Sequence, residues 1–157
     1  MVETYRTYYE SEIGLLEIEG TATHVTAINF VAERDSASSE IPAPLETCVQ
    51  QLTEYFVGTR HVFTVPLAPA GTPFQQQVWQ ALATVPFGEK RTYAEIARQI
   101  GHPEAYRAVG NANGRNKISV ILPCHRIVGS DGKLTGYGGG LWRKEWLLQH
   151  EQTHVLE

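Results

Sequence analysis

The chain of 157 residues has only two cysteines, and none of its apolar runs approaches the roughly 18 residues that a membrane-spanning helix requires. Two cysteines form one disulfide at most, which excludes a disulfide-stabilised scaffold and a cysteine-rich zinc module. The N-terminal segment MVETYRTYYESEIG contains neither a basic nor an apolar stretch, so no secretory signal is indicated. We therefore expect a soluble, cytoplasmic protein of a reducing compartment with no membrane partner.

Internal repeats and low-complexity tracts are also lacking. The apolar fraction of 42% is sufficient for a hydrophobic core and too high for a disordered chain. A chain of this length forms one domain or two small ones.

The net charge of −4 hides an uneven distribution. Residues 1–84 carry three basic and ten acidic side chains, whereas residues 85–145 carry ten basic and five acidic ones. This asymmetry favours a basic functional region attached to an acidic one. Chance clustering on a solvated surface is the alternative.

The first half of the chain predicts a sheet followed by a helix. Residues 5–10, 15–19 and 25–31 form short alternating runs that indicate an antiparallel meander. Apolar residues then recur at helical spacing from Leu45 to Phe56. Cys48 lies on this apolar face, which favours a buried, inert thiol.

The segments after that helix mark a boundary. Gly58 ends the helix, and His61–Val65 is expected to form one more strand. The segment PLAPAGTP resembles a linker and predicts a domain boundary near residues 66–72.

The second half is predicted to be mostly helical. Apolar spacing indicates a helix from Phe74 to Val85, and a capping box of Thr92 and Glu95 begins the next one. After a turn at Gly101, Pro103 suits the first turn of a further helix. This pattern predicts either a helix-turn-helix or a plain hairpin of two helices.

The remaining elements surround a cysteine. Residues 117–122 (KISVIL) predict a short buried strand, and a glycine-rich loop spans residues 129–140. The last helix is expected from about Leu141 to about Glu151, with an inward face made of Trp142, Trp146, Leu147 and His150.

Pro123-Cys124-His125-Arg126 carries the strongest chemical signal. A thiolate is a powerful nucleophile at neutral pH, and a neighbouring histidine or arginine lowers the pKa of a thiol. A structural cysteine with an incidental histidine remains the alternative. A cysteine phosphatase is excluded, because it needs an arginine where this chain has Ser130.

Two other motifs carry weaker chemical signals. His150-Glu151-Gln152-Thr153-His154 matches the H-E-x-x-H helix of zinc peptidases, but few residues follow it to supply a third ligand. The alternative is an ordinary helix C-terminus, where a histidine interacts favourably with the helix dipole. The loop GYGGG lacks the glycine spacing of a dinucleotide-binding motif, because Leu141 stands where a glycine is needed. Two interpretations remain, a tight loop around a flat ligand and a flexible surface loop.

Several segments between residues 72 and 151 resemble one family. They are TPFQQQVW, VPFGEKRTYAEIA, YRAVGNANGRN, ILPCHRIVGSDGKLTGYGGG and RKEWLLQHE, in that order. Their sequence and spacing are similar to those of the O6-alkylguanine-DNA alkyltransferases, or methylated-DNA–protein-cysteine methyltransferases, of the bacterial constitutive type. The first half resembles the family only in its strand-then-helix pattern and in the lead-in to GTPF.

The resemblance implies an α/β (α+β) fold and a monomer. Residues 1–68 would form an N-terminal antiparallel-sheet domain with a helix. Residues 69–157 would form a mostly helical, winged-helix-like domain with a helix-turn-helix, which binds DNA and accepts the alkyl group.

The implied reaction is a single, irreversible transfer to Cys124. The alkyl group comes from O6-alkylguanine, and less well from O4-methylthymine, in double-stranded DNA after base flipping. No cofactor and no metal are expected, since the thiolate is both nucleophile and final acceptor. His125 would deprotonate Cys124 through a water, Glu151 would orient His125, Asn116 would brace the turn, and Tyr137 would assist the departing guanine.

The resemblance also implies a DNA-binding surface. Arg107 would fill the space of the flipped base, and Tyr93 would contact the target nucleotide and its phosphate. The other expected contacts are the small residues Ala105, Ala108 and Gly110 in the minor groove, the basic residues Arg115, Arg126 and Lys133 at the DNA backbone, and Ile127, Gly138 and Gly139 in the substrate pocket. Related lesion-binding proteins without activity replace the cysteine, usually with tryptophan; Cys124 argues against that alternative.

Overall fold

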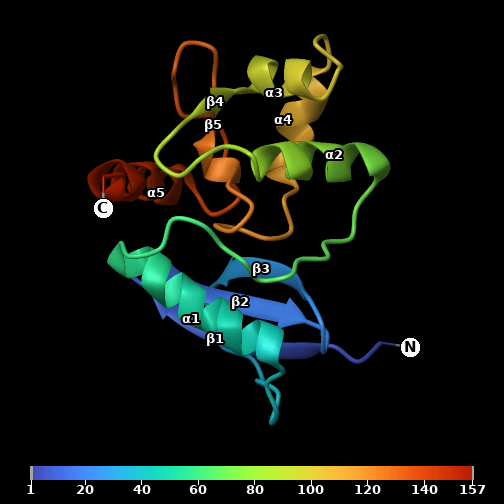
Figure 1. Cartoon of the computed structure of the whole chain (residues 1–157), viewed down its shortest axis with the longest axis vertical. Coiled ribbons are helices and arrows are strands. Elements are labelled where there is room, and N and C mark those ends of the chain that lie inside the picture. Colours follow the sequence, from blue (N-terminus) through green and yellow to red (C-terminus); the bar gives the residue numbers. More distant parts are fainter. Residues whose placement is uncertain (1, 157) are drawn as a thin grey trace. The chain divides into compact units, whose positions relative to one another are not determined.

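The computed structural model describes residues 2–156, which divide into two compact units. Unit 1 comprises residues 2–70 together with Lys117–Ser119, and unit 2 comprises residues 71–116 and Val120–Leu156. Figure 1 shows a sheet with one helix in unit 1 and several helices joined by long loops in unit 2. Within residues 2–156, no helix combines the length and the apolar character needed to cross a bilayer.

Unit 1 is built on an antiparallel sheet. Its strands are β1 (Tyr5–Ser11), β2 (Gly14–Gly20) and β3 (Val25–Val31), in the order β1-β2-β3. Alternation places Leu16 and Ile18, both fully buried, on the same face of β2. The predicted meander is confirmed.

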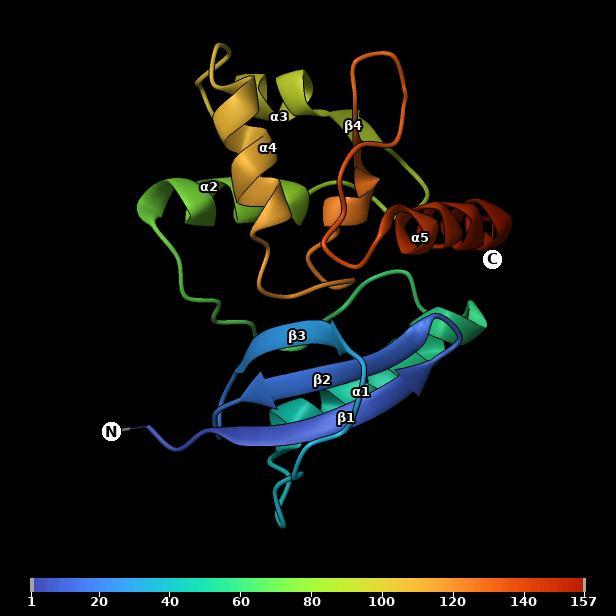
Figure 2. The same ribbon diagram turned by 180° about the vertical axis from the view of Figure 1, so that it is seen from behind.

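Helix α1 (Ala43–Val57) covers one face of this sheet (Figure 2). It ends at Gly58, whose φ of 92° is left-handed and whose N–H donates to the carbonyl of Tyr55 at 3.0 Å. Cys48 is a free thiol with no exposed surface. Both the predicted helix and the predicted burial of this cysteine are confirmed.

The strand expected at His61–Val65 is wrong. The side chain of Gln51 in α1 accepts the backbone N–H of Thr64 at 3.0 Å and donates to the Thr64 hydroxyl at 2.6 Å. This backbone donor therefore needs no strand partner. Sheet pairing occurs slightly later, in a single parallel bridge between Leu67 and Val25.

Unit 2 begins with helix α2 (Pro73–Leu82), which ends three residues before the predicted boundary at Val85. Thr72 and Gln75 form a capping box at its start that the sequence reading had missed. The indole N–H of Trp79 donates to the carbonyl of Ala112 at 2.9 Å. This buried hydrogen bond fixes α2 against helix α4 (Tyr106–Gly114).

Helices α3 (Tyr93–Gln99) and α4 (Tyr106–Gly114) pack against each other. The predicted capping box of Thr92 and Glu95 is confirmed, and Gly101 makes the turn with a φ of 82°. The helix start expected at Pro103 is wrong. The N–H of Ala105 donates to the carbonyl of His102 at 2.9 Å, so this stretch is a separate turn and α4 begins after it.

The remaining elements are the short 3-10 helix η1 (Cys124–Arg126), strand β5 (Ile127–Val128) and helix α5 (Leu141–His154). Strand β5 pairs in parallel with β4 (Arg91–Thr92). Helix α5 was predicted, but Trp142 is 56% exposed and does not face inward as expected. Its ring instead lies against the guanidinium of Arg143.

The strand predicted for KISVIL is wrong, although its apolar residues are buried. Ile118 forms one parallel bridge with Ile28 in unit 1, and the chain then turns at Val120 into unit 2. Val120 has a φ of 72°, which a β-branched residue rarely adopts. Apolar, β-branched composition indicated burial here but not an extended backbone. The α+β class itself is confirmed.

Candidate active site

The turn from Val120 to Pro123 positions Cys124. The N–H of Cys124 donates to the carbonyl of Leu122 at 2.8 Å. The side-chain amide of Asn116 donates to the same carbonyl, also at 2.8 Å. The structure thus places Asn116 at the turn that holds the cysteine, where bracing of that turn was expected.

The thiol of Cys124 is buried among polar groups. The residue is 6% exposed. Burial raises the pKa of the thiol, whereas a hydrogen bond from Asn116, the charge of Lys144 and nearby backbone groups act to lower this pKa. Burial therefore opposes ionisation of the thiol, and the neighbouring polar and charged groups favour it.

His125 and Glu151 form a buried pair. His125 Nε2 lies 2.6 Å from Glu151 Oε2, and both side chains are almost completely buried. His125 belongs to η1 and Glu151 to α5, so the pair joins elements that are 26 residues apart in the sequence. The structure brings together the histidine and the glutamate that the sequence predicted as partners.

Arg126 belongs to the same cluster, which contradicts the predicted contact with the DNA backbone. Its Nε donates to Glu151 Oε1 at 2.7 Å, and its Nη2 donates to Glu151 Oε2 at 3.0 Å. Its Nη1 donates to the carbonyl of Val85 at 2.6 Å. The buried carboxylate of Glu151 holds the guanidinium inside the protein.

These contacts assign the protons. Burial acts to raise the pKa of Glu151, but the charges and hydrogen bonds of His125 and Arg126 hold that pKa well below its ordinary value. Burial lowers the pKa of His125, despite the opposing effect of Glu151. At neutral pH, a carboxylate thus accepts the proton on Nε2 of a neutral imidazole. Nδ1 then carries a lone pair, and this buried atom has no hydrogen-bond partner within residues 2–156.

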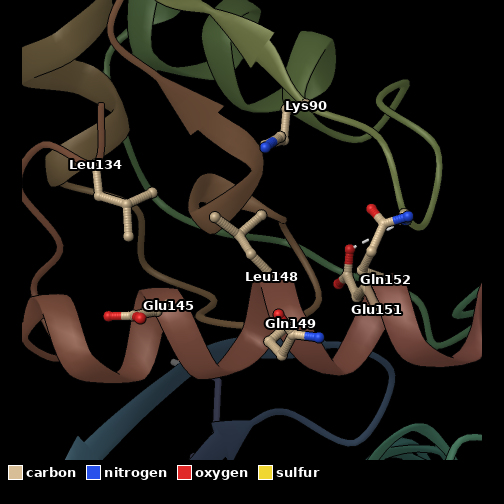
Figure 3. Close-up of a pocket in the computed structure, with 8 residues that line it drawn as sticks. Lys90, Leu134, Glu145, Leu148, Gln149, Glu151 and Gln152 are labelled. Carbon is tan, nitrogen blue, oxygen red and sulfur yellow. Dashed lines mark hydrogen bonds between the residues drawn. The ribbon is translucent and has the colours of Figure 1, made fainter. Parts of the chain in front are cut away.

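Gly88 also contacts Glu151, a role that the sequence reading had missed. Its N–H donates to Glu151 Oε1 at 3.2 Å. A small cavity of about 170 Å³ adjoins this contact, as Figure 3 shows. It is lined by Gly88, Lys90, Leu134, Glu145, Leu148, Gln149, Glu151 and Gln152. Neither Cys124 nor Tyr137 lines it, so we assign no substrate to this cavity.

A larger cavity of about 450 Å³ lies between α3, α4 and the glycine-rich loop. Asn113, on its wall, donates from its side chain to the carbonyl of Cys124 at 3.3 Å. The other lining residues are Tyr93, Tyr106, Arg107, Gly110, Gly114, Thr135, Gly136 and Tyr137. A pocket of this size accommodates a nucleobase. Asn113 therefore links the backbone of Cys124 to a cavity that suits a base.

Tyr137 connects this cavity to the thiol. Its hydroxyl is buried without a hydrogen-bond partner in the described part of the chain. Burial, and the nearby charge of an ionised Cys124, raise the pKa of the phenol well above its ordinary value. The phenol thus stays protonated at neutral pH and is able to donate.

Lys144 is a second residue that the sequence reading had missed. It is completely buried, and its ammonium donates to the carbonyl of Thr135 at 2.8 Å. Burial lowers the pKa of Lys144 to about 8, whereas the charge of Cys124 acts to raise it. The segment RKEW contained the signal, since Lys144 lies on α5 three residues before the buried Leu147.

The remaining predicted residues occupy different environments. Tyr93 contacts the glycine-rich loop through a hydrogen bond of 2.6 Å between its hydroxyl and that of Thr135. Ile127 is buried in β5, and the carbonyl of Gly139 accepts a hydrogen bond from Arg143. Gly138 is exposed. Arg107, Ala108, Arg115 and Lys133 are exposed, and Ala105 and Gly110 are half-buried.

The HEQTH segment does not assemble a zinc site. Glu151 is engaged by His125, Arg126 and Gly88, whereas the ring of His150 stacks on Trp146 at 4.8 Å. Residues 2–156 contain no group of three or more His, Cys, Asp or Glu side chains placed to hold a metal ion.

Two family models match this chain. Residues 4–69 match the family described as 6-O-methylguanine DNA methyltransferase, ribonuclease-like domain, and residues 73–153 match the DNA binding domain of the same name. A methylated-DNA–protein-cysteine methyltransferase of Mycolicibacterium paratuberculosis is 48% identical, over 98% of this chain and 94% of its own.

Two solved structures from Mycobacterium tuberculosis are similar. The O6-methylguanine methyltransferase has a TM-score of 0.87 at 44% identity, over 97% of this chain and 94% of its own. The OGT protein in complex with DNA has a TM-score of 0.84 at 48% identity, over 94% of this chain and 92% of its own. The resemblance inferred from the sequence is confirmed, and the chain belongs to the 6-O-methylguanine DNA methyltransferase family.

Proposed function

We propose that this chain repairs alkylated DNA by moving an alkyl group from guanine O6 to Sγ of Cys124, once per molecule. O4-methylthymine is a poorer substrate of the same reaction. The observation that carries the proposal is the buried set of Cys124, His125 and Glu151 next to a cavity of about 450 Å³. Membership of the family supports the same chemistry.

The proposed step balances without a cofactor. The thiol proton passes to Nδ1 of His125 through a water, and the carboxylate of Glu151 stabilises the resulting imidazolium. The thiolate attacks the alkyl carbon, so that a C–S bond forms and the C–O6 bond breaks. The electron pair of that bond stays on guanine O6, to which the hydroxyl of Tyr137 donates a hydrogen bond. The proton held by the imidazolium then passes through solvent to guanine, so His125 returns to its neutral form. Because the thioether has no leaving step, the protein acts once.

The proposed substrate is double-stranded DNA, since a related structure from M. tuberculosis is a complex with DNA. The reactive atom of a paired guanine is not accessible in a duplex, so the base must leave the stack. Its destination is the cavity lined by Tyr93, Arg107 and Tyr137. Arg107 fills the space left behind, and Tyr93 contacts the target nucleotide.

We assign the DNA-binding and alkyl-acceptor functions to residues 69–157 of a monomer. This part includes the basic segment 85–145, whereas residues 1–84 are acidic. Arg115 and Lys133 are exposed and suit contacts with phosphates, and Ala105, Ala108 and Gly110 allow close approach of α4 to the minor groove. The backbone of Cys124, Ile127, Gly138 and Gly139 borders the flipped base.

Intact-mass measurement tests this proposal. The protein is incubated with excess duplex carrying one O6-methylguanine, and with the same duplex carrying guanine. We expect a gain of one methyl group per chain with the lesion and none with the control. Peptide mapping should place the methyl group on Cys124. Methyl loss from the DNA without a mass gain, or more than one turnover per chain, would refute the proposal.

A further inference from the structure

Tyr106 is an aromatic residue at the mouth of the larger cavity that the proposed reaction does not use. It is the first residue of α4 and is 49% exposed. Three and seven residues later, Val109 and Asn113 lie on the same side of the helix and are buried. The inward-facing side of α4 therefore continues to its first turn, where about half of the Tyr106 surface is exposed.

The side chain of Tyr106 has no polar or aromatic partner in the described part of the chain. Within residues 2–156 it forms no hydrogen bond, ion pair or ring contact, and the same is true of Arg107 beside it. Both residues line the cavity of about 450 Å³. A free aromatic ring and a free guanidinium thus stand together at the place where a nucleotide would enter.

The surrounding residues leave room for a flat partner. Gly110, one turn after Tyr106, has no side chain, and the ring of Tyr93 lies 3.7 Å from the position that a β-carbon there would take. Two tyrosines thus flank a glycine along the opening of the cavity.

From this arrangement we infer that Tyr106 contacts DNA by stacking on a nucleobase that borders the gap left by the flipped nucleotide. The inference rests on the proposed function. Flipping leaves the bases on each side of the gap without a stacking partner on one face, and aromatic side chains take such faces regardless of sequence. Arg107 occupies the gap, and Tyr106 covers an adjacent base. The side chain thereby stabilises the open duplex and not the alkyl transfer itself.

The test compares rates on three substrates for Tyr106→Ala and Tyr106→Phe. The substrates are an O6-methylguanine duplex, the corresponding single strand, and free O6-benzylguanine, which needs no flipping. We expect Tyr106→Ala to react about tenfold more slowly or worse with the duplex, as expected for the loss of one stacked base. The defect should shrink with the single strand and vanish with O6-benzylguanine. Tyr106→Phe keeps the ring and should match the parent protein on all three.

Trp142→Ala is the matched control, because it removes another exposed aromatic ring of unit 2 that does not line the cavity. It should leave the ratio of duplex to free-base rates unchanged. An unchanged duplex rate in Tyr106→Ala, or an equal loss with O6-benzylguanine, would overturn the inference. A parent protein that transfers no methyl group from DNA would refute the proposed function instead, so the two failures are distinguishable.

Discussion

The two cysteines occupy buried sites of different character. Cys48 lies on the apolar face of α1, where burial alone raises the pKa of its thiol to about 12. Cys124 is buried as well, but Asn116, Lys144 and backbone groups act to lower its pKa. His125 follows Cys124 in the chain, and the fold brings Glu151 of α5 into contact with His125.

Burial is therefore common to both thiols, and the groups around each thiol differ. An apolar environment favours the neutral form, and only fixed charges and hydrogen bonds compensate for the loss of water. In unit 2 these groups come from α5, η1 and the turn after α4.

Exchanging the cysteines should have the largest effect. Cys124→Ser should abolish methyl transfer completely, because serine at this position remains a neutral, weak nucleophile. Cys48→Ser, in contrast, should react at the parent rate, although the hydroxyl in an apolar site should lower stability. Intact mass and melting curves measure both. Residual transfer to Cys124→Ser would assign the nucleophile elsewhere.

Glu151→Gln should reduce both activity and stability. The amide cannot stabilise an imidazolium, so transfer should slow by about a hundredfold or more. The change also leaves the buried guanidinium of Arg126 without a counter-charge, which should cost about 3–5 kcal/mol of the free energy of unfolding. Glu145→Gln, an exposed change on the same helix, is the control for rates and for chemical denaturation. Equal behaviour of the two variants would contradict a relay through Glu151.

The pH dependence of stability provides a second measurement on this pair. The pKa of Glu151 is depressed in the folded protein, so its contribution is complete above its ordinary value near 4.5. Below that pH the unfolded chain binds more protons, and the stabilisation is lost as the pH falls toward the depressed pKa. The difference in unfolding free energy between the parent and Glu151→Gln should therefore shrink on acidification. A constant difference would show that the carboxylate is not stabilised by folding.

Gly88→Ala should have a smaller effect on the same carboxylate. Gly88 has a φ of 82°, and an added β-carbon would lie 2.4 Å from a methyl carbon of Val155. Gly132→Ala is a matched control, because its φ is 80° and nothing lies within 4 Å of the added carbon. Backbone strain should cost each variant about 1–2 kcal/mol. Overpacking should cost Gly88→Ala about 1–3 kcal/mol more in denaturation experiments, with slower transfer.

Removal of the Lys144 charge should have the smallest effect, visible as a change with pH. The pKa of Lys144 is about 8 in the folded protein and 10.5 ordinarily. Between these values the unfolded chain holds more protons, so raising the pH should stabilise the fold. In a Cys124→Ser background, the stability of the protein relative to its Lys144→Met variant should rise from pH 8 to 10. If the stability difference between the two proteins does not change with pH, the ammonium of Lys144 is freely hydrated and this prediction is wrong.

Local patterns in the sequence predicted a large part of the fold. Alternation located the three strands of unit 1, and the capping box of Thr92 and Glu95 located the start of α3. These features depend on residues close together in the chain, which is why their spacing is informative. The motif around Cys124 likewise indicated the chemistry and the family, because its residues are contiguous.

Other features depend on residues that are far apart in the sequence. Arg126 looked like a surface cation until the fold brought Glu151 and the carbonyl of Val85 to it, 25 and 41 residues away. Val120 belongs to a β-branched run, yet its backbone turns because the chain passes there between two units.

The sequence by itself determined the three strands of unit 1, the principal helices, and the candidate nucleophile Cys124 with its neighbour His125. The tertiary structure alone decided which charges are buried together, which groups Gly88 and Lys144 contact, and that Tyr106 stays half-exposed. The physical reason is that local periodicity reports which face of an element is apolar. Desolvation and pairing of a charge depend on which distant groups the fold places beside it.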